Sequence, residues 1–282
     1  TNIRGQPRTR RTNKVQQVSD LAQLFMTLYW LRQYPLMSTM EIIFHLHERD
    51  VVRYLNRALK VLRPSIQDEI RWPTDDEFQN YINQITDITG DRFQGVVCCV
   101  DGSEFRVVRP SNNANQRRLY SVKKKQHSLN VMFICLLNGV LIYVSDSEEG
   151  AHDQRFWNRL ELRSKFRGKP HGILADGGFY LNRKGDEERI NGFTPFKRDK
   201  VSASIEDEKK EFNRKLSQLR VVIENCLAQV KKWRVLKQVF RHYSTSKHNY
   251  ISFDDVIHIV SCLANMKMKN TPLRKAKWHP KL

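Results

Sequence analysis

Two short apolar stretches of this chain each run directly into an Asp-Gly pair. Residues 96–100 (VVCCV) precede Asp101-Gly102, and residues 173–175 (ILA) precede Asp176-Gly177. Small apolar residues bounded by glycine are typical of strands that are buried in a sheet. We therefore predict two core strands, each with a carboxylate at its end, where the side chain leaves the core and faces whatever binds at the edge of the sheet.

A hairpin signal lies between these two strands. Residues 129–137 (LNVMFICLL) and 140–144 (VLIYV) are rich in β-forming residues and are joined by Asn138-Gly139, the strongest short-range hairpin signal. Residues 105–108 predict a further extended segment, and residues 153–160 and 206–233 have the apolar spacing of helices. Strands that pair in a hairpin and then alternate with helices predict an α/β fold, a ribonuclease H-like mixed sheet with covering helices.

The region before the first strand is predicted to be a small all-α region. The first helix starts at Ser19 or Asp20 and ends at Tyr34-Pro35, and its apolar spacing comes from Leu21, Leu24, Phe25, Leu28 and Leu31. A short second helix starts at Ser38 or Thr39, and a third spans 48–62 and ends before Pro64. The third helix has a basic outer face, formed by Arg49, Arg53 and Arg57. Such a trio matches a DNA-reading helix-turn-helix, and a purely structural bundle is the alternative.

A fourth helix is predicted for residues 74–89. Thr74 is its candidate N-cap, and three acidic residues in the first turn complement the helix dipole. We interpret these acids as capping residues rather than as a metal site.

Basic residues outnumber acidic ones by 49 to 30 in the 282-residue chain, a formal net charge of +19. The excess is clustered, since residues 65–100 have a net charge of −5 and the segments before and after have +7 and +17. Clustered positive charge favours a polyanionic partner over a charge excess that only keeps the protein in solution. Nucleic acid is the first candidate for this partner, and an anionic membrane surface is the second. No run of eighteen apolar residues occurs, so we expect no membrane-spanning helix.

Charge and element pattern together predict four regions. They are a basic disordered arm at 1–19, a helical helix-turn-helix region with a connector at 20–94, an α/β domain at 95–240 and a basic C-terminal region at 241–282. Each of the two basic ends can be a localisation signal, a segment that binds nucleic-acid phosphates or a solvated tail. The five cysteines are odd in number and form no Cys-x-x-Cys pair, which argues against a disulfide framework and a zinc ribbon.

Three carboxylates of the α/β region are candidates for a metal site. Asp101 and Asp176 follow strands, and Glu224 lies on a predicted helix. In-line cleavage of a phosphodiester benefits from two divalent ions about 4 Å apart, and Mg²⁺ takes hard oxygen ligands. The glycine after each Asp lets a nucleic-acid backbone approach closely. The alternatives are an ordinary strand-end Asp and, for Glu224, a surface ion pair with Arg220 or Lys231.

Five segments together carry a family resemblance. They are VDGSE at 100–104, RLYSVKKKQHSLNV at 118–131, EGAHD at 149–153, LADGGFY at 174–180 and FNRKLSQLRVVIENCLAQVKKWRVL at 212–236. In this order they resemble the PIF/Harbinger transposases and their domesticated relatives, which are DDE superfamily endonucleases. The resemblance covers roughly residues 95–240, and residues 21–73 are similar to the helix-turn-helix that often precedes this nuclease.

The resemblance implies roles for single residues. The family's two catalytic Asp residues fall on Asp101 and Asp176, and its Glu falls on Glu224. This implies a metal-dependent DNA endonuclease that uses a DDE carboxylate triad with two divalent ions, Mg²⁺ or Mn²⁺. A Gly-x-x-His-Asp element of the family is matched by Gly150, His152 and Asp153, with one residue fewer between the Gly and the His. Asp153 either assists metal binding or caps the following helix.

The motifs depart from the family at three places. Gln154 stands where Ser is usual, Asp-Ser-Gly-Tyr becomes Asp176-Gly177-Gly178-Phe179, and Leu216 replaces the His of a Tyr-Asn-x-x-His element. The three acids are retained, so the metal site is expected to be intact while transposition is left open.

Basic side chains near the motifs are candidates for phosphate contacts, which would make binding depend on salt. They are Lys123, Lys124, Lys125, Lys231, Lys232 and Arg234, together with the helix-turn-helix arginines Arg49, Arg53 and Arg57. Solvated surface charge is the alternative for each. We expect a nuclear protein whose partner is DNA, with a Myb-like accessory DNA-binding protein and a homo-oligomer as further partners that the resemblance implies.

Two other functions compete with the nuclease. A domesticated, catalytically silent DNA-binding protein would need only the helix-turn-helix and the basic charge. An RNA-processing ribonuclease H-like enzyme would need the α/β domain alone, and the helix-turn-helix counts against it.

Overall fold

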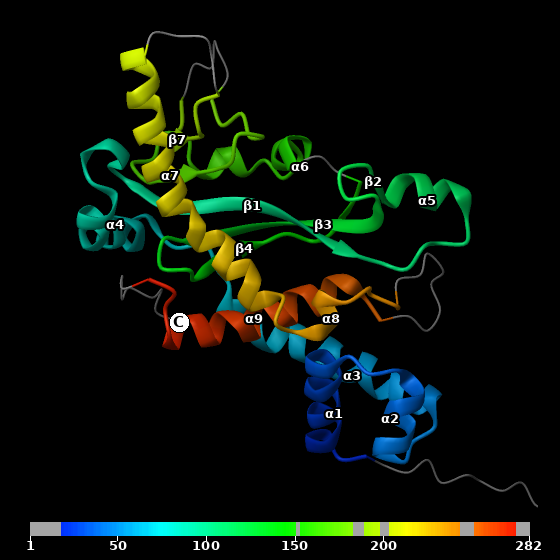
Figure 1. Ribbon diagram of the computed structural model, residues 1–282. Coiled ribbons are helices and arrows are strands. Elements are labelled where there is room, and N and C mark those ends of the chain that lie inside the picture. The colour runs from blue at the N-terminus through cyan, green and yellow to red at the C-terminus, as the bar shows by residue number, and fades with distance from the viewer. Residues whose placement is uncertain (1–17, 151–152, 183–188, 198–202, 243–250, 275–282) are drawn as a thin grey trace, which may run out of the picture.

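A mixed β-sheet forms the centre of the computed structural model (Figure 1), which describes residues 18–150, 153–182, 189–197, 203–242 and 251–274. Its strands are β1 (Val96–Arg106), β2 (Tyr120–Ser121), β3 (Gln126–Leu136), β4 (Leu141–Val144), β5 (Glu148–Glu149), β6 (Gly172–Leu174) and β7 (Gly192–Phe193). They lie in the order β2-β3-β1-β6-β7, and β4 and β5 also pair with β3. β1 is antiparallel to β3 and parallel to β6. The mixed sheet, preceded by helices along the chain, confirms the predicted class and is consistent with a ribonuclease H-like fold.

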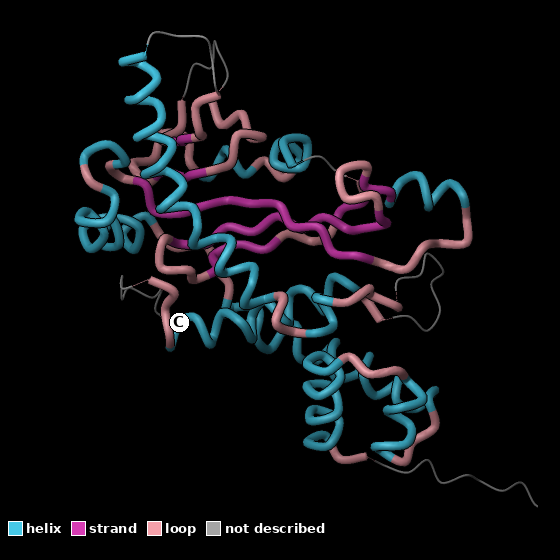
Figure 2. Tube along the Cα trace, viewed as in Figure 1, coloured by secondary structure: helices cyan, strands magenta, loops and turns pink. Residues whose placement is uncertain are grey.

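Helices α1, α2 and α3 form a group below the sheet in the view of Figures 1 and 2, and α7 crosses the sheet obliquely. The helices are α1 (Asp20–Gln33), α2 (Met37–Phe44), α3 (Glu48–Ile66), α4 (Asp75–Thr89), α5 (Asn113–Leu119), α6 (Asp153–Arg159), α7 (Ala203–Val230), α8 (Arg234–Lys237) and α9 (Phe253–Asn270). Short 3-10 turns lie at Gln67–Glu69, Asp91–Phe93 and Leu162–Lys165. None of the described helices is long and apolar enough to cross a membrane.

Two predicted local structures are confirmed. β3 and β4 form an antiparallel hairpin around Asn138-Gly139, where Gly139 has a φ of +94° that favours glycine. Helix α4 begins with a capping box: the Thr74 hydroxyl accepts from the Glu77 N–H at 3.3 Å, and the Thr74 N–H donates to the Glu77 carboxylate at 2.9 Å.

The prediction that the first core strand ends at Asp101 is wrong. β1 continues to Arg106, because its antiparallel pairing with β3 extends from Cys98 opposite Leu136 to Arg106 opposite Ser128. Asp101 and Gly102 are the first residues of β1 that are not fully buried. Asp101 therefore lies in the middle of a long strand, at the point where the strand leaves the core.

The apolar spacing predicted for α1 also fails to mark its buried face. Leu21 and Phe25 are 77% and 63% exposed. The buried residues of α1 are Gln23, Met26, Thr27, Trp30 and Leu31. The indole of Trp30 packs edge-on against the ring of His242, which fixes the inward face of the helix through a contact far away in the chain.

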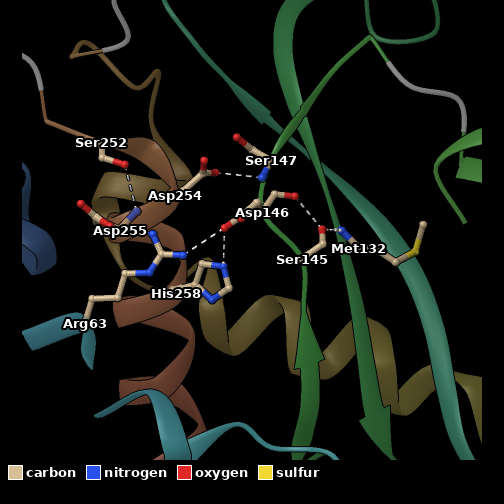
Figure 3. Close-up of polar contacts among 9 residues, drawn as sticks. All are labelled: Arg63, Met132, Ser145, Asp146, Ser147, Ser252, Asp254, Asp255 and His258. Carbon is tan, nitrogen blue, oxygen red and sulfur yellow. Dashed lines mark hydrogen bonds and ion pairs between the residues drawn. The ribbon is translucent and has the colours of Figure 1, made fainter. Parts of the chain in front are cut away.

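Ion pairs connect α3 to α9 and to the segment between β4 and β5 (Figure 3). The Arg63 guanidinium bonds to Asp255 at 2.7 Å and to Asp146 at 3.1 Å, and His258 Nε2 lies 3.0 Å from the same Asp146 oxygen. α3 runs past Pro64 to Ile66, so the prediction that Pro64 stops this helix is wrong. Pro64 lies in the last turn of the helix, where its missing N–H removes only one hydrogen bond.

The C-terminal region contains a core helix that the basic composition did not predict. Nine apolar or small polar residues of α9, together with Asn265, are buried. Asn265 accepts a hydrogen bond from the Leu141 N–H at 2.7 Å and donates to the Leu141 carbonyl at 3.0 Å. α9 therefore closes the β4 edge, which lacks another strand partner in the described sheet.

Candidate active site

The pairing of β1 with β6 brings two of the predicted acids together. Cys99 of β1 is paired in parallel with Leu174 of β6. Asp101 and Asp176 each lie two residues beyond this pair, so the pairing of the strands brings the two acids near one another. Asp176 lies two residues after the end of β6, and its carboxylate accepts the Gly178 N–H at 2.8 Å, which holds the turn after the strand.

Helix α7 brings the third acid over the sheet (Figure 1). The predicted apolar stripe of this helix is buried at Leu216, Leu219, Ile223 and Val230, and the Cys99 thiol lies 3.9 Å from the Leu219 carbonyl oxygen. α7 therefore packs directly on β1. Beside the buried stripe α7 carries the half-buried Arg220 and, one turn later, the exposed Glu224.

A cavity of about 560 Å³ lies between these elements. Asp101, Asp176 and Glu224 all border it, although they are distant in the sequence, and so does Asp153 at the start of α6. The structure thus collects the three predicted acids around one space and adds a fourth. His152, the neighbour of Asp153 in the predicted Gly-x-x-His-Asp element, lies outside the described residues.

The charges in this cavity act on Asp101. Its pKa is raised from the ordinary 3.8 to about 6, chiefly by burial, and the charges of Asp176 and Asp153 act in the same direction. The Arg220 guanidinium opposes this shift. The negative charges of Asp176 and Asp153 disfavour the ionised form of Asp101, and a cation in the cavity would have the opposite effect.

Lysine and arginine side chains surround the acids. Three predicted phosphate contacts, Lys123, Lys124 and Lys231, border the cavity. Burial is the main cause that lowers the pKa of Lys231, whose ammonium lies 5.0 Å from the centre of the Phe105 ring. A surface of alternating acid and base suits a ligand that carries phosphates and is held beside metal ions.

The comparison with known families decides the affiliation. A family model described as DDE superfamily endonuclease matches residues 100–265, more than half of the chain. The chain belongs to the DDE superfamily endonucleases. The matched residues begin just before Asp101 and include most of α9. No curated protein and no solved structure matches the chain.

DDE superfamily endonucleases generally use divalent metals, and the oxygen donors of this cavity fit such ions in their chemistry. Burial is the main cause of the raised pKa of Asp101, and the charges of Asp176 and Asp153 add to it, an effect that a divalent cation in the cavity would oppose. Within the ranges that the structure describes, however, no group of three His, Cys, Asp or Glu side chains is close enough to hold a metal ion. The metal triad therefore stays a prediction for this DDE superfamily endonuclease.

Two bases of the cavity, Arg106 and Lys237, were not singled out from the sequence of this endonuclease. Arg106 shares the strand with Gly102 and Glu104, which also border the cavity. Because the strand was predicted to end at Asp101, Arg106 was not placed beside the acids. Lys237 lies on the short helix α8, which no separate pattern in the sequence predicted.

The remaining predicted phosphate contacts do not border the cavity. Lys125 is exposed in a turn. The Lys232 carbonyl accepts a hydrogen bond from Arg32 of α1 at 2.9 Å, and Arg234 donates to Gln33 at 3.4 Å, so this segment contacts the N-terminal helices.

The three helix-turn-helix arginines lie on the solvent side of α3. Arg53 pairs with Asp50 at 3.0 Å, Arg57 lies 3.7 Å from Asp20, and Arg49 is exposed. Exposed pairs of this kind are weak, so a DNA phosphate could compete for both guanidinium groups. DNA binding at these arginines stays a prediction.

Proposed function

We propose that the chain is a transposase-derived, metal-dependent DNA nuclease of the PIF/Harbinger type, with Asp101, Asp176 and Glu224 as its catalytic acids. The observation that carries the proposal is the cavity, where three carboxylates from separate segments of a DDE superfamily endonuclease are surrounded by basic side chains. The acids suit divalent ions and the bases suit the phosphates of a nucleic acid.

In the proposed mechanism, Asp101, Asp176 and Glu224 would hold two Mg²⁺ or Mn²⁺ ions. When bound, these ions supply Lewis-acid stabilisation of the charge that develops during in-line attack on phosphorus. Water would form the new bond to phosphorus and release a proton to solvent, while the bond from phosphorus to the 3′-oxygen breaks and this oxygen takes up a proton, which leaves a 5′-phosphate and a 3′-hydroxyl. Asp101, with a pKa of about 6, is mostly ionised at neutral pH, as a ligand must be.

The basic side chains bind and orient the DNA backbone in this proposal. Lys123 and Lys124 are exposed in the turn between β2 and β3, and reach the outer phosphates. Lys231 is half-buried against Phe105, so it loses little side-chain freedom when it binds a phosphate. The net charge of +19 assists the approach of the DNA.

We further propose that the protein acts in the nucleus. Its assembly partners would be a Myb-like accessory DNA-binding protein and a second copy of the chain. Both ideas are supported by the resemblance of the ordered motifs to PIF/Harbinger proteins and by the strongly basic composition.

The proposal is tested by cleavage of supercoiled DNA in Mg²⁺ or Mn²⁺. We expect the wild type to nick or linearise the plasmid, and Asp101→Asn, Asp176→Asn and Glu224→Gln each to abolish the reaction. Asp207→Asn is the matched control, since Asp207 is an exposed acid of α7 that pairs with Lys210. Cleavage that survives all three substitutions contradicts the assignment, whereas salt-dependent DNA binding without cleavage by the wild type favours the catalytically silent DNA-binding protein.

A further inference from the structure

Two aromatic rings are exposed beside the Asp176 end of the cavity. Tyr180 lies in the loop after Asp176 and is 56% exposed, and Phe196 lies in the segment after β7 and is 50% exposed. β7 pairs in parallel with β6, and a Cβ added to Gly177 would lie 3.6 Å from the Pro195 side chain. The loop after Asp176 and the segment of Phe196 therefore lie side by side at this edge of the sheet.

Hydrogen bonds from side chains hold the backbone at each ring. The Phe196 N–H donates to the Asn213 side-chain oxygen of α7 at 2.8 Å, and the Phe196 carbonyl accepts from the Asn213 amide at 3.0 Å. The Phe196 ring also packs on Phe212, with 4.7 Å between the ring centres. The Tyr180 N–H donates to the Gln154 side chain. Rings whose backbone is already fixed lose little freedom when a ligand binds.

A lysine side chain accompanies each ring. The Lys197 ammonium lies 5.5 Å from the centre of the Tyr180 ring and 3.5 Å from its hydroxyl oxygen. The Lys209 ammonium of α7 lies 5.9 Å from the centre of the Phe196 ring. Lys197 follows Phe196 directly in the chain. Tyr180, Phe196, Lys197 and Lys209 thus form one aromatic–basic surface.

This surface fits unpaired nucleotides better than an intact duplex. An exposed ring stacks on the face of a base, and lysines beside it bind the adjacent phosphates. In a duplex the faces of the bases are covered by neighbouring base pairs. Duplex DNA could therefore contact the lysines of this surface but not its rings. The two lysines also favour a polyanion over a partner protein with an apolar docking face.

We propose that the aromatic–basic surface binds unpaired nucleotides of the DNA, so that the protein prefers DNA that is locally melted. The inference rests on the proposed function as a DNA nuclease, for which it names the substrate class. Opening a duplex costs free energy, and stacking of the released bases on the two rings would offset part of this cost.

Binding of the full chain to labelled DNA tests this inference independently of cleavage, first in EDTA and then with Ca²⁺. Fluorescence anisotropy compares a duplex with the same duplex carrying a short internal bubble, and the ratio of the two affinities is the readout. The wild type should prefer the bubble. Tyr180→Ala and Phe196→Ala should each lower the ratio at least about fivefold, because each removes one stacking contact.

Two further variants serve as controls. Phe25→Ala removes a ring that is 63% exposed on α1, at the opposite end of the molecule from β7 in Figure 1. It should leave the ratio unchanged, since any effect on the helix-turn-helix would alter both affinities alike. Tyr180→Phe keeps the ring and should keep the preference for the bubble. If circular dichroism shows that Phe196→Ala does not fold, Tyr180→Ala decides.

The outcomes separate this inference from the proposed function. A wild type that binds and cleaves duplex DNA but does not prefer the bubble overturns the inference alone. A preference that survives both alanine variants also overturns it, and would leave the rings to a protein partner. An equal loss in Phe25→Ala overturns it as well, because the effect would then not depend on this surface. A wild type that binds neither DNA overturns both the inference and the proposed function.

Discussion

The acids at the start of α4 and the acids of the cavity are in opposite electrostatic situations. Arg71 donates two hydrogen bonds to the Glu77 carboxylate, at 2.8 and 2.6 Å, and with the Thr74 N–H it lowers the pKa of Glu77 to about 2. Asp101 is buried near other acids, and its pKa is raised to about 6. The ionised form of a carboxyl group is thus stabilised at the start of α4 and destabilised in the cavity.

This difference separates a structural use of carboxylates from a functional one. The α4 acids begin a helix and stabilise the fold when they are charged. The cavity keeps acids together at a cost in stability, which is typical of sites that bind or transform a ligand. Substitutions in the two regions should therefore have opposite effects on stability and on activity.

The largest expected effect is on DNA cleavage. Asp176→Asn should lower the cleavage rate at least about 10³-fold, because a ligand of the catalytic ions is lost, while the thermal unfolding temperature stays the same or rises. Glu77→Gln should leave cleavage close to wild type and lower the unfolding temperature. Plasmid cleavage and thermal melts of the two variants, measured side by side, check both statements. A Glu77→Gln variant that is folded but inactive would contradict the purely structural role of the α4 acids.

The second effect is a gain in stability from Asp101→Asn in the absence of metal. Because the folded-state pKa of about 6 lies above the unfolded value of 3.8, the charged carboxylate costs stability above pH 6. The cost disappears as the pH falls through 6 and is gone below about pH 4. The difference between the two pKa values corresponds to up to about 3 kcal/mol.

Urea unfolding at pH 8 and pH 4 in the presence of EDTA measures this gain. Asp101→Asn should be more stable than the wild type at pH 8, and the two proteins should converge at pH 4. A variant that is equally stable at pH 8, or less stable, would show that the Asp101 charge is already compensated in the folded protein.

The third effect has the opposite sign and comes from Glu77. Its folded-state pKa of about 2 lies below the ordinary 4.5, so the charged group stabilises the protein above pH 4.5, and this stabilisation is lost as the pH falls from 4.5 towards 2. Glu77→Gln should cost about 1–2 kcal/mol at pH 7, since the pair and the capping box are partly solvated. Urea titrations at pH 7 and pH 3 should show the difference from wild type shrinking at the lower pH.

The parts of the site that follow from local patterns could be predicted from the sequence. An apolar run before Asp101 or Asp176 marks a strand in a parallel pair, and α7 shows its buried stripe directly. The hairpin at Asn138-Gly139 follows from the backbone preference of glycine. Each of these features is determined by residues that are close together in the sequence, so the sequence alone is enough to predict it.

The parts that depend on distant contacts could not be predicted. Leu21 and Phe25 have the spacing of a buried face, yet Trp30 turns α1 the other way by packing on His242. The position of Asp153 at the start of α6 depends on a hydrogen bond from Asn130 of β3, and no periodicity along the chain indicates such a contact. The role of α9 was hidden because its buried residues lie in a region whose basic composition dominated the interpretation.

The smallest effect extends the comparison from acids to bases. Lys231 borders the cavity, whereas Lys169 pairs with Asp75 at the start of α4, at 2.5 Å. If Lys231 contacts a DNA phosphate, Lys231→Gln should reduce the slope of log affinity against log salt by about 1, because one fewer counterion is released on binding. Lys169→Gln removes the same charge and should leave the slope unchanged. Fluorescence anisotropy with labelled duplex DNA over a salt series distinguishes the two variants, and equal slopes would mean that the bases of the cavity contribute only to the overall charge.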